Sequence, residues 1–216
     1  MRDTHREQDQ KETGRVEAFS DGLFAFAITL LVLNLKVPDA ADLSADHGLL
    51  GALRAQWPSY LAYLISFLTI LIMWMNHHKL FQFIQRVDHN LLLFNGLLLL
   101  GVTVEPFTTS LLASYIMRPD ARVAAAVYSG TFVWIALFYN VMWGYAVSGG
   151  RLLHRDHDRH RVRKITQQYM FGPAFYIVAF IADFVNVTAC VVICLLLAVF
   201  FAIPETWLGR KPVGPP

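Results

Sequence analysis

Six apolar stretches occupy most of this chain, and each is about as long as a helix that crosses a membrane. A hydrocarbon core about 30 Å thick is spanned by roughly 17–25 predominantly apolar residues in a helix. Charged residues make up only 16% of the sequence, whereas soluble domains contain about 25%. We therefore predict an all-α membrane protein with six transmembrane helices, at about 17–36, 58–78, 91–117, 123–147, 166–185 and 187–204.

The lysines and arginines are divided unequally between the two ends of these predicted spans. The two terminal segments and the connections after the second and fourth spans together hold 14 of the 18. Basic residues are retained on the cytoplasmic side of a membrane. We therefore predict that both termini are cytoplasmic, with a tail at 1–14, a transmembrane domain at 15–204 and a second tail at 205–216. The composition of the two ends predicts that both tails are disordered.

The sequence lacks the residue patterns of common catalytic and metal-binding sites. It contains no Ser-x-x-Lys, Gly-x-Ser-x-Gly or His-Glu-x-x-His motif. His77 and His78 are neighbours, so their side chains point about 100° apart on a helix, and no cysteine lies near them. Cys190 and Cys194 are expected to pack within the last span. We therefore expect no enzyme activity, no metal and no cofactor, and nothing in the sequence favours a nucleic acid partner.

One face of the first predicted helix carries bulky apolar side chains and a hydroxyl group. At about 100° per residue, this stripe contains Phe19, Gly22, Phe26, Thr29, Leu30 and Leu33. Small residues in and beside the stripe permit close approach of neighbouring helices in lipid. On this pattern alone, packing within the membrane is favoured over a pore, because a helix that is apolar on all sides is most simply a buried span.

A set of polar and aromatic side chains gathers at the predicted cytoplasmic ends of the first two helices. Its members are Arg15, Phe19, Ser20 and Asp21 in the first helix and Trp74, Asn76 and His77 in the second. Buried polar groups at this depth need partners. We therefore predict a structural polar cluster in which a carboxylate bonded to Ser, Trp, His or Asn fixes the rotation of the first helix. Ion contact or proton sensing stays open as an alternative.

Three further features of the sequence are interpreted as structural. Glu105, next to Pro106 in the third span, is assigned a structural partner or a position in an outer vestibule, with substrate coupling as the alternative. Asp183 and Asn186 are predicted to cap the turn between the last two spans. The basic segment 151–164 is interpreted as a positive-inside loop, with contact to anionic lipid headgroups as the alternative.

The start of the first span and the end of the second form a more specific pattern. The first contains Arg15-x-x-x-Phe19-Ser20-Asp21, continued by Gly-Leu-Phe-Ala-Phe-Ala-Ile-Thr, and the second contains Trp74-Met-Asn-His-His. These motifs and the six-span length resemble the prokaryotic members of the transmembrane protein 175 family of potassium channels. The resemblance implies a homotetramer in the cytoplasmic membrane, in contact with membrane lipid, with K⁺ as its permeant ion.

The resemblance also implies a pore that lacks a carbonyl filter, and no Thr-Val-Gly-Tyr-Gly occurs in the sequence. Four first helices would surround the axis, with a constriction at Phe26, Leu30 and Leu33 and a selectivity layer at Thr29. Relatives usually carry an aliphatic side chain where this sequence has Phe26, so the width of the constriction is expected to differ. Apolar rings block ions by dewetting, and a hydroxyl ring binds a cation without full charge, so leak-like conduction is expected. A secondary transporter is the alternative, although the sequence shows neither midplane ionisable residues nor an inverted repeat.

Overall fold

Regular structure in the described part of the chain is helical. The computed structural model describes residues 2–39, 48–150, 152–154 and 158–202. Its helices are α1 (Arg2–Leu30), η1 (Leu31–Asn34), α2 (Gly48–Ala55), α3 (Trp57–Phe81), α4 (His89–Tyr115), α5 (Ala121–Val147), η3 (Ser148–Gly150), α6 (Arg159–Met170), α7 (Gly172–Asp183) and α8 (Val187–Ala202). Strand-like pairing among these residues is limited to an isolated antiparallel bridge between Ile84 and Leu153. The predicted all-α class is confirmed.

Four helical segments are long and apolar enough to cross a membrane, by length and composition alone. They are Asp9–Asn34, Trp57–Phe81, His89–Tyr115 and Ala121–Gly150. Each overlaps one of the first four predicted spans. The largest difference is at the first, which begins earlier than residue 17 because α1 is helical from Arg2 onwards.

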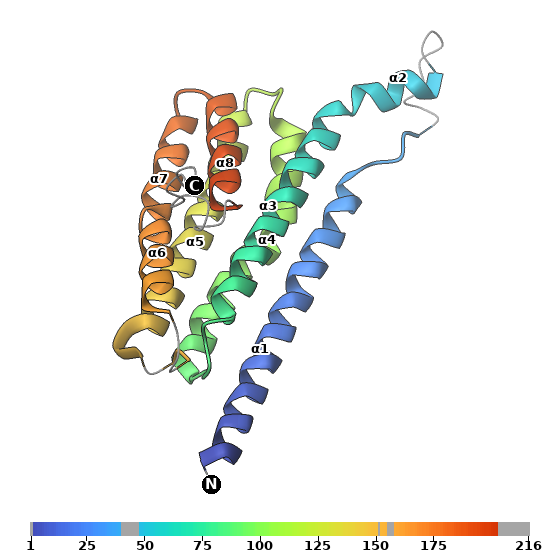
Figure 1. Ribbon diagram of the computed structural model, residues 1–216. Helices are drawn as coiled ribbons and strands as arrows, with labels where there is room; N and C mark the ends of the chain where they lie inside the picture. The colour runs from blue at the N-terminus through green and yellow to red at the C-terminus, as the bar shows by residue number, and fades with distance from the viewer. Residues whose placement is uncertain (1, 40–47, 151, 155–157, 203–216) are drawn as a thin grey trace, which may run out of the picture.

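The region of the last two predicted spans contains three shorter helices. α6 and α7 have 12 residues each, and α8 has 16. The break between α6 and α7 falls at Phe171, directly before Gly172 and Pro173. Proline lacks a backbone N–H, and its ring collides with the carbonyl four residues earlier, so a helix kinks or ends there. α6 and α7 nevertheless follow one another along one line beside α5 (Figure 1). The count of six spans stays a prediction.

The N-terminal segment is helical, and the prediction that it is disordered is wrong. Two contacts fix it to the connection between α3 and α4. Thr13 Oγ1 donates to the carbonyl oxygen of Gln85 at 2.9 Å, and Arg86 Nε donates to Asp9 Oδ2 at 2.6 Å. Composition does not show such contacts, because the partners are more than seventy residues apart in the sequence. The predicted tail at 205–216 lies outside the described residues.

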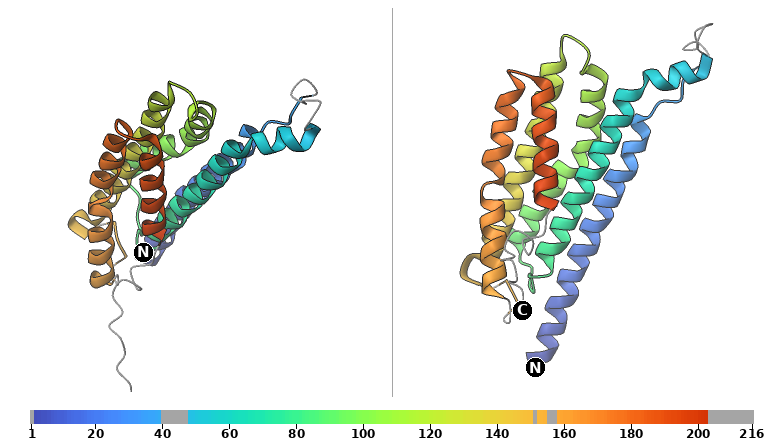
Figure 2. Two further views of the ribbon diagram at one scale, coloured as in Figure 1. Left: turned by 90° about the horizontal axis from the view of Figure 1, so that it is seen from above. Right: turned by 45° about the horizontal axis from the view of Figure 1, so that its top comes forward.

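The helices form an elongated bundle with α1 along one edge (Figure 1). α1 packs on α3 and α4, α4 packs on α5, and α7 and α8 pack on α5. At the end away from the N-terminus, α2 extends outward from the bundle beside the end of the first span (Figure 2). This arrangement covers α1 on one side and leaves its other side without a neighbour in the described chain.

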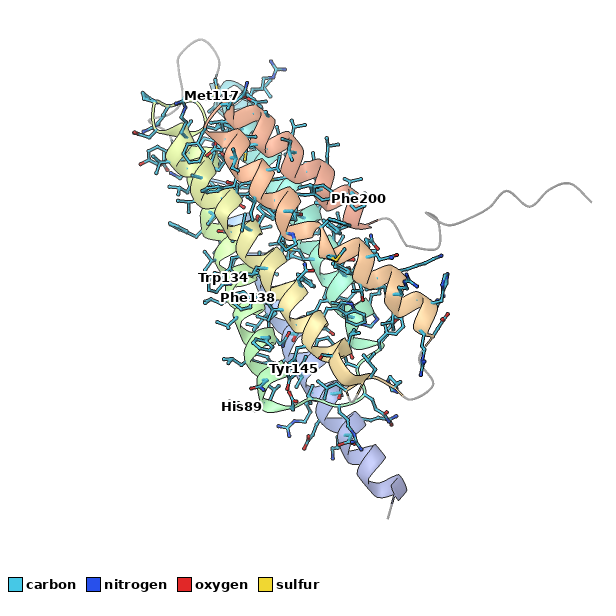
Figure 3. All side chains as sticks on the ribbon, turned by 90° about the vertical axis from the view of Figure 1, so that its left-hand side faces the viewer. His89, Met117, Trp134, Phe138, Tyr145 and Phe200 are labelled. Carbon is cyan, nitrogen blue, oxygen red and sulfur yellow. The ribbon has the colours of Figure 1, made fainter. Side chains whose placement is uncertain are left out.

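A glycine allows α4 and α5 to approach closely. A Cβ atom at Gly101 would lie 2.7 Å from Ile135 Cγ1 and 2.7 Å from Trp134 Cδ1. Trp134 is held in place because its Nε1 donates to the carbonyl oxygen of Leu97 at 2.7 Å. Its ring also packs on Phe138, and both side chains lie on the outer surface of the bundle (Figure 3). The α4–α5 contact therefore depends on the missing side chain at Gly101.

Candidate functional site

The stripe that the sequence singles out runs from α1 into η1, and it is the face that the described chain leaves uncovered. Phe19, Phe26 and Leu33 are 64%, 57% and 73% exposed, Thr29 is exposed as well, and Leu30 is half-buried. The opposite face is buried in the core, through Phe24, Ala27 and Leu31. One face therefore fixes α1 to the bundle, and no described residue of the chain covers the other.

The hydroxyl group on this stripe has a defined orientation. Thr29 Oγ1 donates to the carbonyl oxygen of Phe26 at 2.8 Å. This bond uses the hydroxyl proton, so the oxygen lone pairs remain available as acceptors. Thr29 therefore presents an acceptor oxygen one helical turn beyond the exposed Phe26 ring.

Three buried polar side chains link α1, α3 and α4 on the opposite side. His77 Nε2 lies 2.8 Å from Asn95 Oδ1, Asn95 Nδ2 donates to Ser20 Oγ at 3.0 Å, and Ser20 Oγ donates to the carbonyl oxygen of Val16 at 2.9 Å. Because Asn95 Oδ1 can only accept, the bond requires a proton on His77 Nε2. His77 Nδ1 is buried without a hydrogen-bond partner, which fits the neutral ring. We call these residues, His77, Asn95 and Ser20, the three-helix network.

A second set of contacts joins α1 to α3 closer to the surface. Trp74 Nε1 donates to Asp21 Oδ1 at 2.8 Å, and His78 Nδ1 lies 2.7 Å from Glu17 Oε1. The rings of Trp74 and His78 are stacked, with centroids 5.9 Å apart. The contacts at Glu17 and Asp21 lie one helical turn apart, so they hold the rotation of α1 as well as its position.

The structure brings together Ser20, Asp21, Trp74 and His77 from the set that the sequence singled out, but it leaves three members outside the hydrogen bonds. Arg15 and Phe19 are exposed and border a groove of about 630 Å³ between α1 and α4. Asn76 is buried on another face of α3, where it borders a small cavity beside Tyr139. These three residues share a sequence motif with the network without sharing its contacts.

Sequence reasoning missed Asn95, Glu17 and the bond made by His78. Asn95 interrupts the apolar run Leu91–Leu100, and a lone amide at that depth is a signal that a partner is needed. The sequence could not show that this partner is His77 on one side and Ser20 on the other, because three helices from separate parts of the chain must meet there.

Glu105 is fully buried between α3, α4 and α5, so a position in an outer vestibule is wrong. Its Oε1 accepts a hydrogen bond from Thr109 Oγ1 at 2.9 Å, and Thr109 Oγ1 lies 2.7 Å from Ser66 Oγ. The structural partner predicted for this acid is confirmed. Next to it, the carbonyl oxygen of Pro106 accepts from Asn34 Nδ2 at 3.0 Å. The end of the first span away from the N-terminus is therefore bonded to the proline of α4.

The remaining candidates lie near the last two helices. Asn186 Oδ1 accepts from the backbone N–H of Ala189 at 3.1 Å, so the predicted cap at the start of α8 is confirmed. Asp183 is buried in the last turn of α7. Cys190 and Cys194 are free and buried, as expected for packing residues. Within the described residues, no group of three His, Cys, Asp or Glu side chains is arranged to hold a metal ion.

Comparison with known proteins gives consistent matches. The family model described as "Endosomal/lysosomal potassium channel TMEM175" matches residues 15–106. A potassium channel of Chamaesiphon minutus is 52% identical over 195 residues, which are 90% of this chain and 96% of that protein. A potassium channel of Streptomyces collinus is 40% identical over 95% of this chain and 98% of its own length. The crystal structure of a lysosomal potassium-selective channel TMEM175 homolog from Chamaesiphon minutus superposes with a TM-score of 0.81, over 89% of this chain and 97% of that one, at 50% identity.

Proposed function

Because this chain belongs to the TMEM175 family of potassium channels, we propose that it is a potassium-permeable, leak-like cation channel of the cell membrane. It is not an enzyme, and its substrate is the permeant K⁺ ion. Four copies assemble around one axis, and the first helix of each copy lines the pore. The protomer has six spans, of which α6 with α7 forms the fifth and α8 the sixth, and both termini are cytoplasmic.

The exposed stripe on α1 is the observation that carries this proposal. Phe26 and Leu33 are more than half exposed in the single chain, although they lie on a helix whose other face is firmly packed. A ring of copies brings these faces together around an axis. Because α1 lies along one edge of the bundle (Figure 1), the helices α3 to α8 of each copy would lie outside the ring of α1 helices, towards the lipid.

The residues on this stripe have two roles in the proposed pore. Phe26, Leu30 and Leu33 form apolar rings that impede ions by excluding water, and conduction requires that these rings widen or become wet. Thr29 forms a ring of acceptor oxygens between them, which replaces part of the hydration shell of a cation. No carboxylate lies on the stripe, so cations are held weakly and pass without tight binding.

The polar contacts on the other side of α1 position this stripe. Ser20 and Asp21 are bonded to α4 and α3 respectively, and both lie within two turns of Phe26. A rotation of α1 that moved Phe26 away from the axis would break both bonds. Ser20 and Asp21 therefore have a structural role, and they are not expected to contact the permeant ion.

The proposal is tested by measuring current through the purified protein in lipid bilayers under a K⁺ gradient, then replacing K⁺ with Na⁺ on one side. We expect a passive current that reverses near the K⁺ potential. No current, together with saturable uptake that requires a second ion gradient, would favour the secondary transporter.

Matched substitutions test which residues line the pore. Phe26→Ala should raise the conductance, and Thr29→Ala should reduce the preference for K⁺ over Na⁺. Phe175→Ala removes an exposed phenylalanine from α7, away from α1. Thr103→Ala removes a half-buried threonine of α4 whose hydroxyl donates to the carbonyl oxygen three residues earlier, as that of Thr29 does. The assignment of the stripe is wrong if Phe175→Ala changes the conductance as much as Phe26→Ala does. It is also wrong if Thr103→Ala changes the preference for K⁺ over Na⁺ as much as Thr29→Ala does.

A further inference from the structure

α6 is a basic helix at the edge of the bundle farthest from α1. Its sequence contains three arginines and one lysine and no acidic residue. It continues into the apolar helix α7 along the same line, with the break at Phe171 between them (Figure 1). Seen from that side, the side chains of α6 extend outward from the side of the bundle (Figure 3). Along this edge of the bundle, the basic residues of α6 are therefore followed by the apolar residues of α7.

Two of the bases lie on one stripe of α6. Arg159, Arg163, Gln167 and Met170 follow at intervals of three and four residues, so they share a face of the helix. All four are exposed. Along this face, the two arginines come first, and the amide of Gln167 and the thioether of Met170 follow in the direction of the apolar helix α7.

A groove separates this stripe from the end of α5. Its volume is about 630 Å³, and both Arg159 and Arg163 border it. Its apolar wall includes Val147, Val162 and Met170. No carboxylate lines it within the described residues. The groove is therefore basic at one end and apolar along its length.

The two arginines are available to a ligand. Neither Arg159 nor Arg163 forms an ion pair with any described residue. The nearest acid on the helix, Asp158, caps the backbone, because its Oδ1 accepts from the N–H groups of His160 and Arg161 at 2.8 and 3.3 Å. These two bonds lower the pKa of the Asp158 carboxyl, so the cap stays ionised at neutral pH. The helix start is thus satisfied by its own cap, and among the described residues the guanidinium groups of Arg159 and Arg163 have no acidic partner.

We propose that this groove between α5 and α6 binds one anionic phospholipid, whose phosphate lies between Arg159 and Arg163 and whose acyl chain lies along Val147, Val162 and Met170. Arginine pairs with phosphate oxygens through several N–H groups at once. The site goes beyond ion conduction. Its level in the membrane and its place in the cytoplasmic leaflet rest on the spans and the orientation proposed above.

A lipid fits the groove better than a free phosphate for two reasons. The lining beyond the arginines is apolar and would gain little from a soluble anion. Arg159 and Arg163 also precede the fifth proposed span at 166–185, which places them at the level of phospholipid headgroups. The alternation of charge and apolar surface matches the two parts of a phospholipid.

The test is the binding of defined lipids to the full-length protein, measured by native mass spectrometry from non-ionic detergent. Dioleoylphosphatidylglycerol is compared with dioleoylphosphatidylcholine, which has the same acyl chains without net charge. The variant Arg159→Gln/Arg163→Gln removes the two bases of the groove. The variant Arg161→Gln/Lys164→Gln removes the same charge from another face of the same helix. These side chains lie at or near the surface, and the melting temperature of each variant is measured beside the binding.

We expect one phosphatidylglycerol per protomer to bind in preference to phosphatidylcholine. The loss of Arg159 and Arg163 should weaken that binding by about 30-fold, from about 1 kcal/mol per base near an anionic lipid. The Arg161/Lys164 variant should bind within about threefold of the natural chain, since its bases do not face the groove.

Three results would overturn the proposal. Equal losses in the two double variants would mean that a diffuse positive surface attracts the lipid. Equal binding of phosphatidylcholine would mean that the headgroup charge is not recognised. Displacement of the lipid by glycerol 3-phosphate at the concentration of the lipid itself would mean that the site binds the phosphate alone. None of these measurements depends on whether the protein conducts ions.

Discussion

The substitution Asn95→Leu should destabilise the protein by breaking the three-helix network. Leucine has nearly the same size as asparagine but cannot form a hydrogen bond. The change removes the 2.8 Å contact to His77 Nε2 and the 3.0 Å bond to Ser20 Oγ. Ser20 keeps its bond to the carbonyl oxygen of Val16. The His77 Nε2–H group, by contrast, is left buried without an acceptor.

The expected loss in the free energy of unfolding is between about 1 and 3 kcal/mol. Two hydrogen bonds between membrane helices contribute about 0.6 kcal/mol each on average, which sets the lower limit. A buried donor that loses its acceptor costs about 1–3 kcal/mol, which sets the upper limit. A loss near the lower limit would mean that the His77 Nε2–H group finds a new acceptor in the Asn95→Leu variant. A loss near the upper limit would mean that it finds none.

The assay is reversible unfolding of the purified protein in mixed micelles of dodecyl sulfate and mild detergent, followed by circular dichroism. Asn76→Leu is the matched control, because Asn76 is also buried on a spanning helix and forms no hydrogen bond with the described residues. It should change the free energy of unfolding by less than about 1 kcal/mol. In a His77→Phe background, Asn95→Leu should cost less than alone, because the unsatisfied donor is gone.

The reasoning would be refuted if Asn95→Leu destabilised the protein no more than Asn76→Leu does. It would also be refuted if the cost of Asn95→Leu were the same with His77 and with Phe at that position. Either result would mean that the contacts between α1, α3 and α4 are held by apolar packing and that the network adds nothing measurable.

Three further substitutions have expected outcomes in the same unfolding assay. Gly101→Ala should cost about 1–3 kcal/mol, because the new Cβ meets Trp134 and Ile135 at 2.7 Å; Gly144→Ala meets no atom within 4 Å and should be neutral. Glu105→Ala should destabilise more than Glu105→Gln, because glutamine keeps an acceptor for the Thr109 hydroxyl. Trp74→Phe leaves the Asp21 carboxylate without its indole donor and should lower the melting temperature; an unchanged melting temperature would mean that water replaces that bond.

The membrane class and the helices were predictable from the sequence because they depend on local composition. The predicted spans 58–78, 91–117 and 123–147 overlap α3, α4 and α5 with limits that differ by a few residues. The length of an apolar run sets these limits, whatever the rest of the chain does. The break at Phe171 was missed, although Pro173 two residues later is a local signal for it.

The hydrogen-bond partners of the polar residues and the ordering of the N-terminal helix were not predictable in the same way. The N-terminal helix is ordered by Thr13 and Asp9 against residues of the α3–α4 connection, so its composition alone gave the wrong result. Asn95 could be recognised as a polar group that needs a partner, but not as a partner of His77. Whether Glu105 has a structural partner or lies in an outer vestibule was decided only by its burial.

By itself, the sequence determined that this protein is a helical membrane protein and that the stripe from Phe19 to Leu33 shares one face of its first helix, because apolar length and helical periodicity are properties of neighbouring residues. Only the tertiary structure decided that this face is uncovered while Phe24 and Leu31 are buried. Periodicity gives the relative direction of side chains, but which direction meets the bundle depends on the bonds at Ser20 and Asp21. Those bonds form between helices that are distant in the chain and adjacent only when it has folded.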